Sequence, residues 1–289
     1  MAPGRPAPGH DTTREETQTE NGGALLHSSG SLRSHRSWGW VLLAFTIAGC
    51  ATVPVTGRKS FNLIPDNQAN AMGADAYRQV LSESKVVTSG PEYRMMMDVG
   101  RRIAAVADQP DYQWEFSLID DPNTVNAFCL PGGKVAVYTG IMPVAQNEDG
   151  LAVVMGHEIA HAVARHGSER MTDQLALQVA GAGLESLLGG ASEGSRSLVL
   201  AAYGVGAQVG VLLPFGRSQE SEADHIGLIY MARAGFDPHE APRFWERMTA
   251  QGGGRPPEFL STHPSPENRV KQLQDWMPEA EREARAAGH

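Results

Sequence analysis

The spacing of apolar residues predicts that most of this chain of 289 residues is helical. Apolar side chains three or four positions apart, with polar ones between them, are typical of helices that bury one side. The pattern predicts such helices over 66–84, 91–107, 218–234, 238–251 and 266–287. The stretch 151–165 is apolar on every side, so we expect it to be a helix that is buried all round.

Shorter stretches alternate apolar and polar residues and predict strands over 113–119, 127–130 and 134–139. The sequence Pro-Gly-Gly at 131–133 separates the last two strands and is typical of a turn. The fold class that follows is α+β, predominantly helical, with a small β-sheet bordering the helix 151–165.

The pattern of the N-terminal part of the chain is typical of a leader. Residues 1–37 are polar and lack apolar periodicity, so we expect disorder. The apolar run 38–49 is too short to span a bilayer but fits the core of a signal peptide. Cys50 ends this run and resembles the cysteine that is lipidated in bacterial lipoproteins. The alternative is an ordinary signal peptide, or a short anchor, with an incidental cysteine.

These features divide the chain into a leader with a lipoprotein signal peptide (1–49), a lipidated tether (50–65) and a folded domain (66–289). Ala51 after the cysteine resembles the outer-membrane sorting pattern of Gram-negative lipoproteins. We therefore expect a lipid-anchored protein on the periplasmic side of the cell envelope, attached to the outer membrane.

Composition narrows the class of protein. With 41% hydrophobic and 20% charged residues, the chain has an ordinary globular composition. Its net charge of −9 argues against nucleic acid as a partner. Only two cysteines are present, which excludes a disulfide framework. We expect Cys129 to pack as a small apolar residue, and a catalytic thiol is the alternative.

The segment 171–214 is rich in Ala, Gly, Leu and Val. We expect two small-residue helices here, which either complete the core or form a lid over a cleft. The apolar run 198–215 also allows a membrane span, although it is short and contains Gln208, Pro214 and several glycines.

The helix 151–165 contains the sequence His-Glu-Ile-Ala-His at 157–161. Histidines four positions apart lie on one face of a helix, so the rings of His157 and His161 can converge on one metal ion. Glu158 follows the first histidine and can take a proton from an attacking water. The alternative is a chance match in an ordinary buried helix, but such a helix has no use for three polar groups unless they are satisfied.

A catalytic zinc site needs a third protein ligand. His166 is half a helical turn out of phase with His157, so we expect it to contact the carbonyl groups at the helix end. Glu220 and Asp224 share a face of the helix 218–234, whereas Glu222 should point elsewhere. Glu220 is the candidate third ligand, and Asp224 can accept a proton from a ligand histidine. Alone, this acidic segment would read as a solvated helix start.

Three segments together resemble family forty-eight of the metallopeptidases, which are gluzincins. They are 157–161, 220–224 and the strand pattern around Asn126, Gly133 and Tyr138. The resemblance extends from about residue 55 to residue 275 and implies a zincin-like metallopeptidase domain. The chain looks most like the short, lipid-anchored periplasmic members of that family.

The resemblance also implies roles for particular residues. His157, His161 and Glu220 match the ligands of one zinc ion, Glu158 matches the catalytic base, and Asp224 matches the carboxylate that supports a ligand histidine. Thr262-His263-Pro264 and Arg269 resemble a later family segment near the site. There the histidine approaches the zinc or stabilises the reaction intermediate.

The function expected is zinc-dependent endopeptidase activity in periplasmic or outer-membrane protein quality control, on misfolded or unassembled envelope proteins. A substrate chain should pair with an exposed strand edge. The candidate strand consists of Ala127, Phe128, Cys129 and Leu130. One alternative is a chaperone or assembly factor for outer-membrane proteins with low or gated proteolytic activity. Another is a tethered binding partner whose cleft the segment 171–214 closes.

Overall fold

The computed structural model describes residues 50–187, 189–190, 192–193, 213–251, 258–263 and 268–289. Its first elements are the strands β1 (Cys50–Thr52) and β2 (Lys59–Phe61) and the helix α2 (Asp66–Ser82). The helix α3 (Pro91–Val106) follows the first strand of the sheet that borders the site. The expected leader and most of the apolar run 198–215 lie outside the described residues. None of the helices within the described ranges is long and apolar enough to cross a membrane.

A four-stranded sheet forms the base of the site, in the order β3-β4-β6-β5. Its strands are β3 (Val86–Val87), β4 (Glu115–Ile119), β5 (Ala127–Leu130) and β6 (Lys134–Tyr138). β4 and β6 are parallel, and the other pairs are antiparallel. Among the described strands, β5 therefore lies at an edge, and its bounds are those expected from the sequence.

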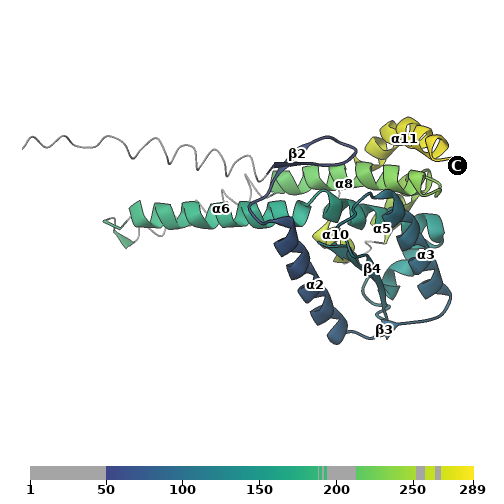
Figure 1. Cartoon of the computed structure of the whole chain (residues 1–289), viewed down its shortest axis with the longest axis horizontal. Coiled ribbons are helices and arrows are strands. Elements are labelled where there is room, and N and C mark those ends of the chain that lie inside the picture. The colour runs from purple at the N-terminus through teal and green to yellow at the C-terminus, as the bar shows by residue number, and fades with distance from the viewer. Residues whose placement is uncertain (1–49, 188, 191, 194–212, 252–257, 264–267) are drawn as a thin grey trace, which may run out of the picture. The chain divides into compact units, whose positions relative to one another are not determined.

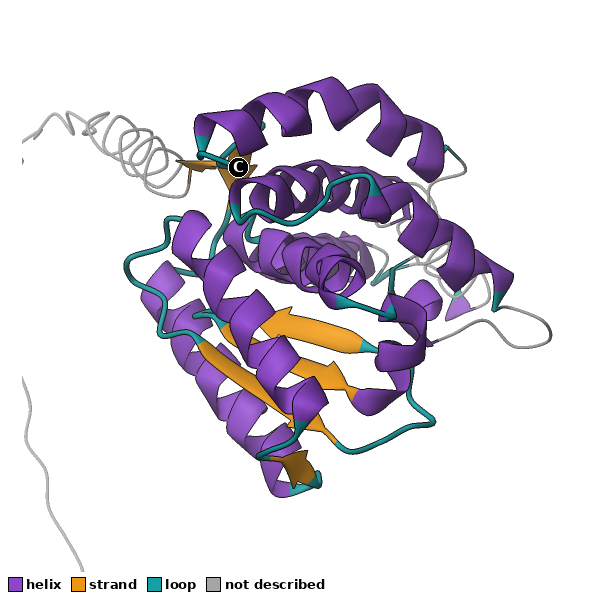
Figure 2. Ribbon diagram, turned by 90° about the vertical axis from the view of Figure 1, so that its right-hand side faces the viewer, coloured by secondary structure: helices purple, strands orange, loops and turns teal. Residues whose placement is uncertain are grey.

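Helices cover both faces of this sheet (Figure 2). Alternate residues of β6 point to opposite faces. Val135 and Val137 belong to the large core, which also contains residues of α3 and of the helix with the predicted histidine pair. Ala136 packs with Tyr77 of α2. The Tyr77 hydroxyl donates a hydrogen bond of 3.0 Å to the Val135 carbonyl, which anchors α2 to the strand.

The chain then passes through the 3-10 turn η1 (Thr139–Ile141) and α4 (Met142–Ala145) into α5 (Glu148–Val163), which contains both histidines of the predicted pair. Residues 150–163 are all buried, as the continuous apolar pattern predicted. Asn147 caps the helix by accepting a hydrogen bond of 2.9 Å from the Gly150 N–H. The fold class predicted from the sequence is confirmed: the protein is mainly helical, with a small sheet beside α5.

α8 (Leu213–Arg233) crosses α5 at two glycines. A Cβ atom added to Gly227 would lie 2.9 Å from the backbone of Gly156 and His157. Only two residues without side chains let the helix backbones approach this closely. The crossing lies beside His157, so it fixes where the acidic residues of α8 meet the histidines of α5.

The C-terminal part of the chain closes the site from the other side. It consists of α9 (Glu240–Ala250), α10 (Glu258–Thr262) and α11 (Arg269–Ala286). α10 was not predicted. It is a short helix of five residues, and it places His263 at its end.

One prediction about an irregular segment requires correction. The expected tether 50–65 is not irregular throughout, because it contains an antiparallel hairpin of β1 and β2, with Cys50 opposite Phe61. Of the two helices expected in 171–214, the first corresponds to α6 (His166–Leu187), and the second falls mostly outside the described residues. The division of the chain into leader, tether and domain stays a prediction.

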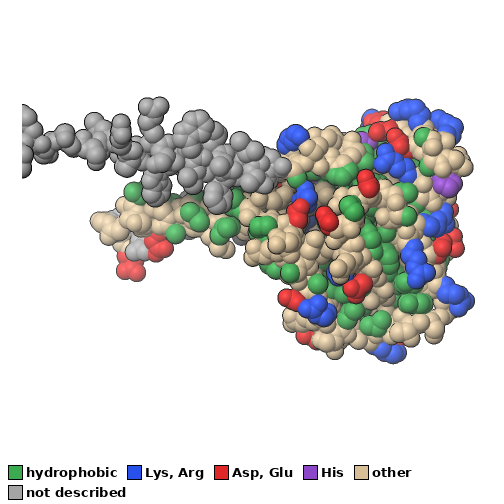
Figure 3. Space-filling model, viewed as in Figure 1, with side chains coloured by type: hydrophobic (Ala, Val, Ile, Leu, Met, Phe, Trp, Pro, Cys, Tyr) green, Lys and Arg blue, Asp and Glu red, His purple; other side chains and the backbone are tan. Residues whose placement is uncertain are grey.

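α6 runs outward from the end of α5 (Figure 1). Its first two turns are anchored by buried residues, among them His166, Glu169 and Thr172. Beyond them the helix carries hydrophobic side chains on its surface (Figure 3), including the exposed Leu175, Val179 and Leu187. The lid role stays a prediction, because most of the segment after Leu187 lies outside the described residues.

Candidate metal centre

Four side chains from three parts of the chain converge on one point. His157 and His161 come from α5, Glu220 comes from α8, and His263 follows α10. All four are buried, and one nitrogen or oxygen atom from each lies within 4.8 Å of those of the others. The structure therefore brings together the three predicted zinc ligands and the more distant histidine.

The distances between these atoms fit a tetrahedral ion. The two Nε2 atoms of His157 and His161 are 3.1 Å apart, and each lies 3.3 Å from an oxygen of Glu220. Ligand atoms at the bond lengths typical of zinc would be about 3.3 Å apart at the corners of a tetrahedron. The donor set of two imidazoles and one carboxylate is also one that zinc accepts.

A carboxylate on α8 orients the first histidine. Asp224 Oδ1 accepts a hydrogen bond of 2.9 Å from the Nδ1 atom of His157, which leaves Nε2 to face the cluster. Arg269 reaches Asp224 at 2.6 Å and Glu220 at 3.1 Å, and its guanidinium lies over the ring of Trp245. Arg269 therefore holds the two carboxylates in place.

Glu158 has one carboxylate oxygen with no hydrogen-bond partner among the described residues. This atom, Oε1, is buried and lies 3.4 Å from His263 Nε2 without hydrogen-bond geometry. An unpartnered buried oxygen normally costs free energy, so its presence beside the cluster indicates a place for an exchangeable proton or water. The donor set and this oxygen together fit a catalytic zinc ion.

Burial and charge shift the pKa values of the groups in this cluster. Burial opposes protonation of His157, but the carboxylates of Asp224 and Glu220 outweigh it and raise its pKa to about 9. Burial lowers the pKa of His161 well below its ordinary value. Burial raises the pKa of Glu158, which favours a carboxyl group able to take up a proton. Three histidines lower the pKa of Glu220 despite its burial, so it stays a carboxylate.

His166 is not where the sequence placed it. The expectation that it contacts terminal carbonyls of its helix is wrong, because its Nδ1 lies 2.9 Å from Nδ1 of His161 and its Nε2 lies 2.9 Å from Glu222. α5 ends at Val163, and Arg165 has a φ of 61°, so helical counting does not continue to His166. Glu222 points away from the cluster, as expected, and toward this histidine.

The candidate substrate strand β5 runs beside the cluster. Its partner is β6 on one side, with Phe128 opposite Ala136 and Leu130 opposite Lys134. The Asn126 carbonyl accepts a hydrogen bond from Tyr138 on β6, so the backbone groups of alternate residues, Ala127 and Cys129, face the other way. The backbone of Cys129 hydrogen-bonds the Glu158 carboxylate, so this edge lies next to the predicted base. The same hydrogen bond offsets part of the rise in the pKa of Glu158.

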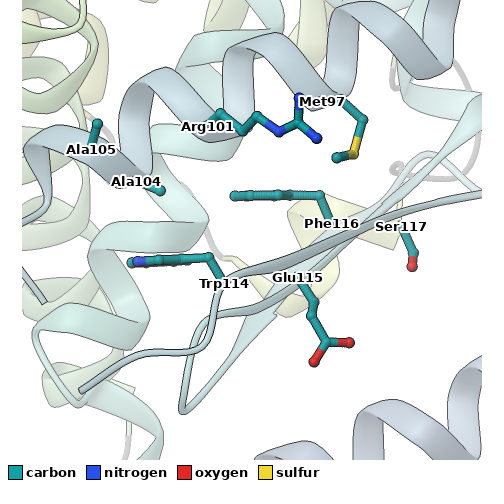
Figure 4. Close-up of a pocket in the computed structure, with 8 residues that line it drawn as sticks. All are labelled: Met97, Arg101, Ala104, Ala105, Trp114, Glu115, Phe116 and Ser117. Carbon is teal, nitrogen blue, oxygen red and sulfur yellow. The ribbon is translucent and has the colours of Figure 1, made fainter. Parts of the chain in front are cut away.

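A separate hollow of about 560 Å³ lies between α3 and β4 (Figure 4). The rings of Trp114 and Phe116 stack in it with centroids 6.3 Å apart. Its lining residues include none of the four cluster residues, so we do not assign it to the candidate metal centre.

Several curated proteins are similar to this chain. Mitochondrial metalloendopeptidase OMA1 of Schizosaccharomyces pombe is 41% identical over 238 residues, which cover 79% of this chain and 67% of that protein. The protein of the same name from Saccharomyces cerevisiae is 29% identical over 265 residues, 82% of this chain and 74% of that protein. The beta-barrel assembly-enhancing protease of Escherichia coli is 32% identical over 224 residues, 76% of this chain and 46% of that protein.

These relatives correct the predicted location. The similar proteins from the two yeasts, Arabidopsis thaliana and Danio rerio are all mitochondrial by name. The expectation of a location on the periplasmic side of a Gram-negative envelope is therefore contradicted. The side chain of Cys50 is not among those described, so its acylation stays a prediction.

A family model also matches the chain. The model described as peptidase family M48 matches residues 92–277, which include both histidines of α5, the acidic residues of α8, His263 and Arg269. It covers more than half of the chain, and its proteolytic chemistry agrees with the buried cluster of metal-binding side chains. The chain belongs to peptidase family M48.

Proposed function

We propose that this protein is a zinc-dependent endopeptidase whose single zinc ion is held by His157, His161 and Glu220. The observation that carries the proposal is their mutual separation of 3.1 to 3.3 Å beside an unpartnered oxygen of Glu158. Zinc, when bound, would lower the pKa of a water molecule and polarise the scissile carbonyl group.

The chain's own residues then carry out the proton transfers. Glu158 Oε1 takes a proton from the attacking water and later delivers it to the leaving amine. Burial raises the pKa of this carboxyl group, which suits a group that must hold the proton between the two steps. Asp224 keeps the ring of His157 in one orientation, and Arg269 keeps Asp224 and Glu220 in place.

The substrates proposed are misfolded or unassembled polypeptides, bound in extended form along β5. The position of this strand at the edge of the described sheet supports such pairing. His263 lies 3.1 Å from Glu220 and 3.4 Å from both Glu158 and His157. A side chain this close to the proposed ligands and the proposed base narrows the way to them, which supports a resting form with restricted access.

The test is the substitution Glu158→Gln, which keeps the shape of the side chain but removes the proton acceptor. We expect hydrolysis of casein to fall about 100- to 10,000-fold, as is usual for the loss of a general base. Zinc content should stay at about one ion per chain. Glu148→Gln is the matched control, because Glu148 is an exposed residue in the first turn of the same helix.

The proposal would be contradicted if casein were hydrolysed at the wild-type rate both in the presence of a chelator and by the Glu158→Gln variant. Normal zinc content without any hydrolysis by the wild type would instead favour a chaperone or assembly factor with a structural zinc ion.

A further inference from the structure

The second histidine of the cluster is held through another imidazole ring. His161 Nδ1 lies 2.9 Å from His166 Nδ1, and His166 Nε2 lies 2.9 Å from Glu222 Oε2. Both histidines are buried, and His166 has no exposed surface. Water therefore does not compete for these contacts, and the two rings must satisfy each other.

The chemistry of these atoms fixes the position of each proton. A carboxylate only accepts hydrogen bonds, so His166 Nε2 donates to Glu222. In a neutral imidazole the other nitrogen then has no proton, so His166 Nδ1 can only accept. The proton between the two rings must belong to His161 Nδ1. This tautomer leaves a lone pair on His161 Nε2, the atom that faces Glu220.

His157, the first histidine of the pair, is also oriented by a carboxylate of α8, but without an intervening ring. Asp224 contacts His157 Nδ1 directly, whereas Glu222 acts on His161 through the ring of His166. Each histidine of α5 thus has a carboxylate of α8 at the far end of its hydrogen bonds. The two carboxylates lie on different sides of α8, which lets one helix orient both rings.

Glu222 is itself held by the N-terminal hairpin. Its carboxylate accepts hydrogen bonds of 2.5 Å from Thr56 and 2.7 Å from Arg58, both in the connection between β1 and β2. Arg58 also pairs with Glu169 of α6 at 2.6 Å. The hairpin therefore bridges α6 and α8 beside the contact between His166, the first residue of α6, and Glu222 of α8.

We propose that His166 and Glu222 are positioning residues that fix the tautomer and orientation of His161, and that Arg58 and Thr56 of the hairpin hold Glu222 for this purpose. The inference rests on the proposed zinc site and adds to it a support outside the four-residue cluster. The competing explanation is that these contacts only fasten the hairpin and α6 to the domain.

α8 provides a matched control pair. His225 Nε2 lies 2.8 Å from Glu279 of α11, so it forms the same type of contact on the same helix. His225 is stacked on Trp276, and the pair is partly exposed. Glu279→Gln therefore repeats the chemistry of Glu222→Gln away from the metal centre.

The first measurement uses the full-length chain stripped of metal, with ¹⁵N-labelled histidines. In the wild type, His161 should give the imidazole signals of the Nδ1–H tautomer. Glu222→Gln lets an amide NH₂ donate to His166 Nε2, which reverses the chain of donors, so we expect a substantial Nε2–H population at His161. Glu279→Gln should leave His161 unchanged. An unchanged His161 tautomer together with unchanged zinc affinity in Glu222→Gln overturns the proposal.

The second measurement is zinc affinity, by competition with a fluorescent chelator. Loss of an outer partner of a metal ligand typically weakens binding about 10- to 100-fold. We expect this loss for His166→Leu, and partial rescue in His166→Gln, whose carbonyl oxygen can accept from His161 Nδ1. Arg58→Gln should give a smaller loss of about threefold or more.

The outcomes separate the two proposals. A wild-type chain that binds no zinc contradicts the proposed function. Zinc binding in the wild type together with equal affinities in Glu222→Gln and Glu279→Gln overturns only the positioning role. A lower melting temperature with an unchanged tautomer and unchanged affinity likewise shows that the contacts are merely structural. If His166→Leu does not fold, the isosteric Glu222→Gln decides the matter alone.

Discussion

The two faces of α8 form charged pairs of similar residue types in very different surroundings. Its inner face carries Glu220 and Asp224, which are buried against α5 and against Arg269 of α11. Its outer face carries His225 and Arg233, which pair with Glu279 and Glu283 at 2.8 Å each. The contact distances on the two faces are similar.

Exposure separates the two faces. The side chains of Glu220, Asp224 and Arg269 are 1–2% exposed, whereas those of Arg233 and Glu283 are about one third exposed. Water can replace a lost partner on the outer face but not on the inner one. The same pair of charges is therefore expected to be essential in one place and nearly dispensable in the other.

The largest effect is expected for Glu220→Gln on the inner face. The amide keeps the volume of the side chain but lacks the anionic oxygen, so zinc affinity should fall more than about 100-fold, beyond the loss typical of outer partners. Elemental analysis after dialysis and chelator competition measure this loss. Zinc binding equal to that of the wild type would remove Glu220 from the ligand set.

A smaller effect is expected where the inner face meets α5. Gly227→Ala adds a Cβ atom 2.9 Å from the backbone of Gly156 and His157, which forces the helices apart. Such overpacking typically costs about 1–3 kcal/mol of unfolding free energy. Because His157 lies at the crossing, zinc affinity should fall as well. Thermal unfolding and chelator competition measure the two losses.

Gly183→Ala is the control for this substitution. Gly183 lies in α6 with nothing within 4 Å of an added Cβ atom, so alanine should be neutral or stabilise by up to about 1 kcal/mol. If both substitutions had the same effect on stability and zinc binding, the close crossing would not be what positions His157.

The smallest effect is expected on the outer face. Arg233→Ala and Glu283→Ala each remove one partner of an exposed pair, and the coupling energy from a double-mutant cycle should be below about 1 kcal/mol. Hydrolysis of casein should be unchanged. A coupling above about 2 kcal/mol would show that exposure does not explain the difference between the faces.

The sequence was sufficient to predict pairs of site residues that lie together on one regular helix. His157 and His161 were predicted from a spacing of four within α5, and Glu220 and Asp224 from the same spacing within α8. The structure brings these groups together as that spacing implied. His166 was misplaced because the positive φ of Arg165 breaks the helix, so its position depends on how α6 leaves α5.

The fold was predictable where patterns were long and regular. The strand 127–130 and the helix 91–107 were predicted within one residue of β5 and α3. The hairpin was read as a tether because its Pro and Gly residues indicate breaks, and its strands have only three residues each. Val55 and Gly57 adopt positive φ in its turn, and Thr56 and Arg58 find their partner 164 to 166 positions away in the sequence.

The short edge strand β5 has a consequence for which proteins can be cut. On the proposed pairing, this strand recognises a guest through the guest's main-chain groups, which all residues except proline share. A natively folded protein already uses these groups in its own helices and sheets. The enzyme would therefore sort proteins by conformational state rather than by sequence, and unfolding of a target would itself be the signal for its destruction.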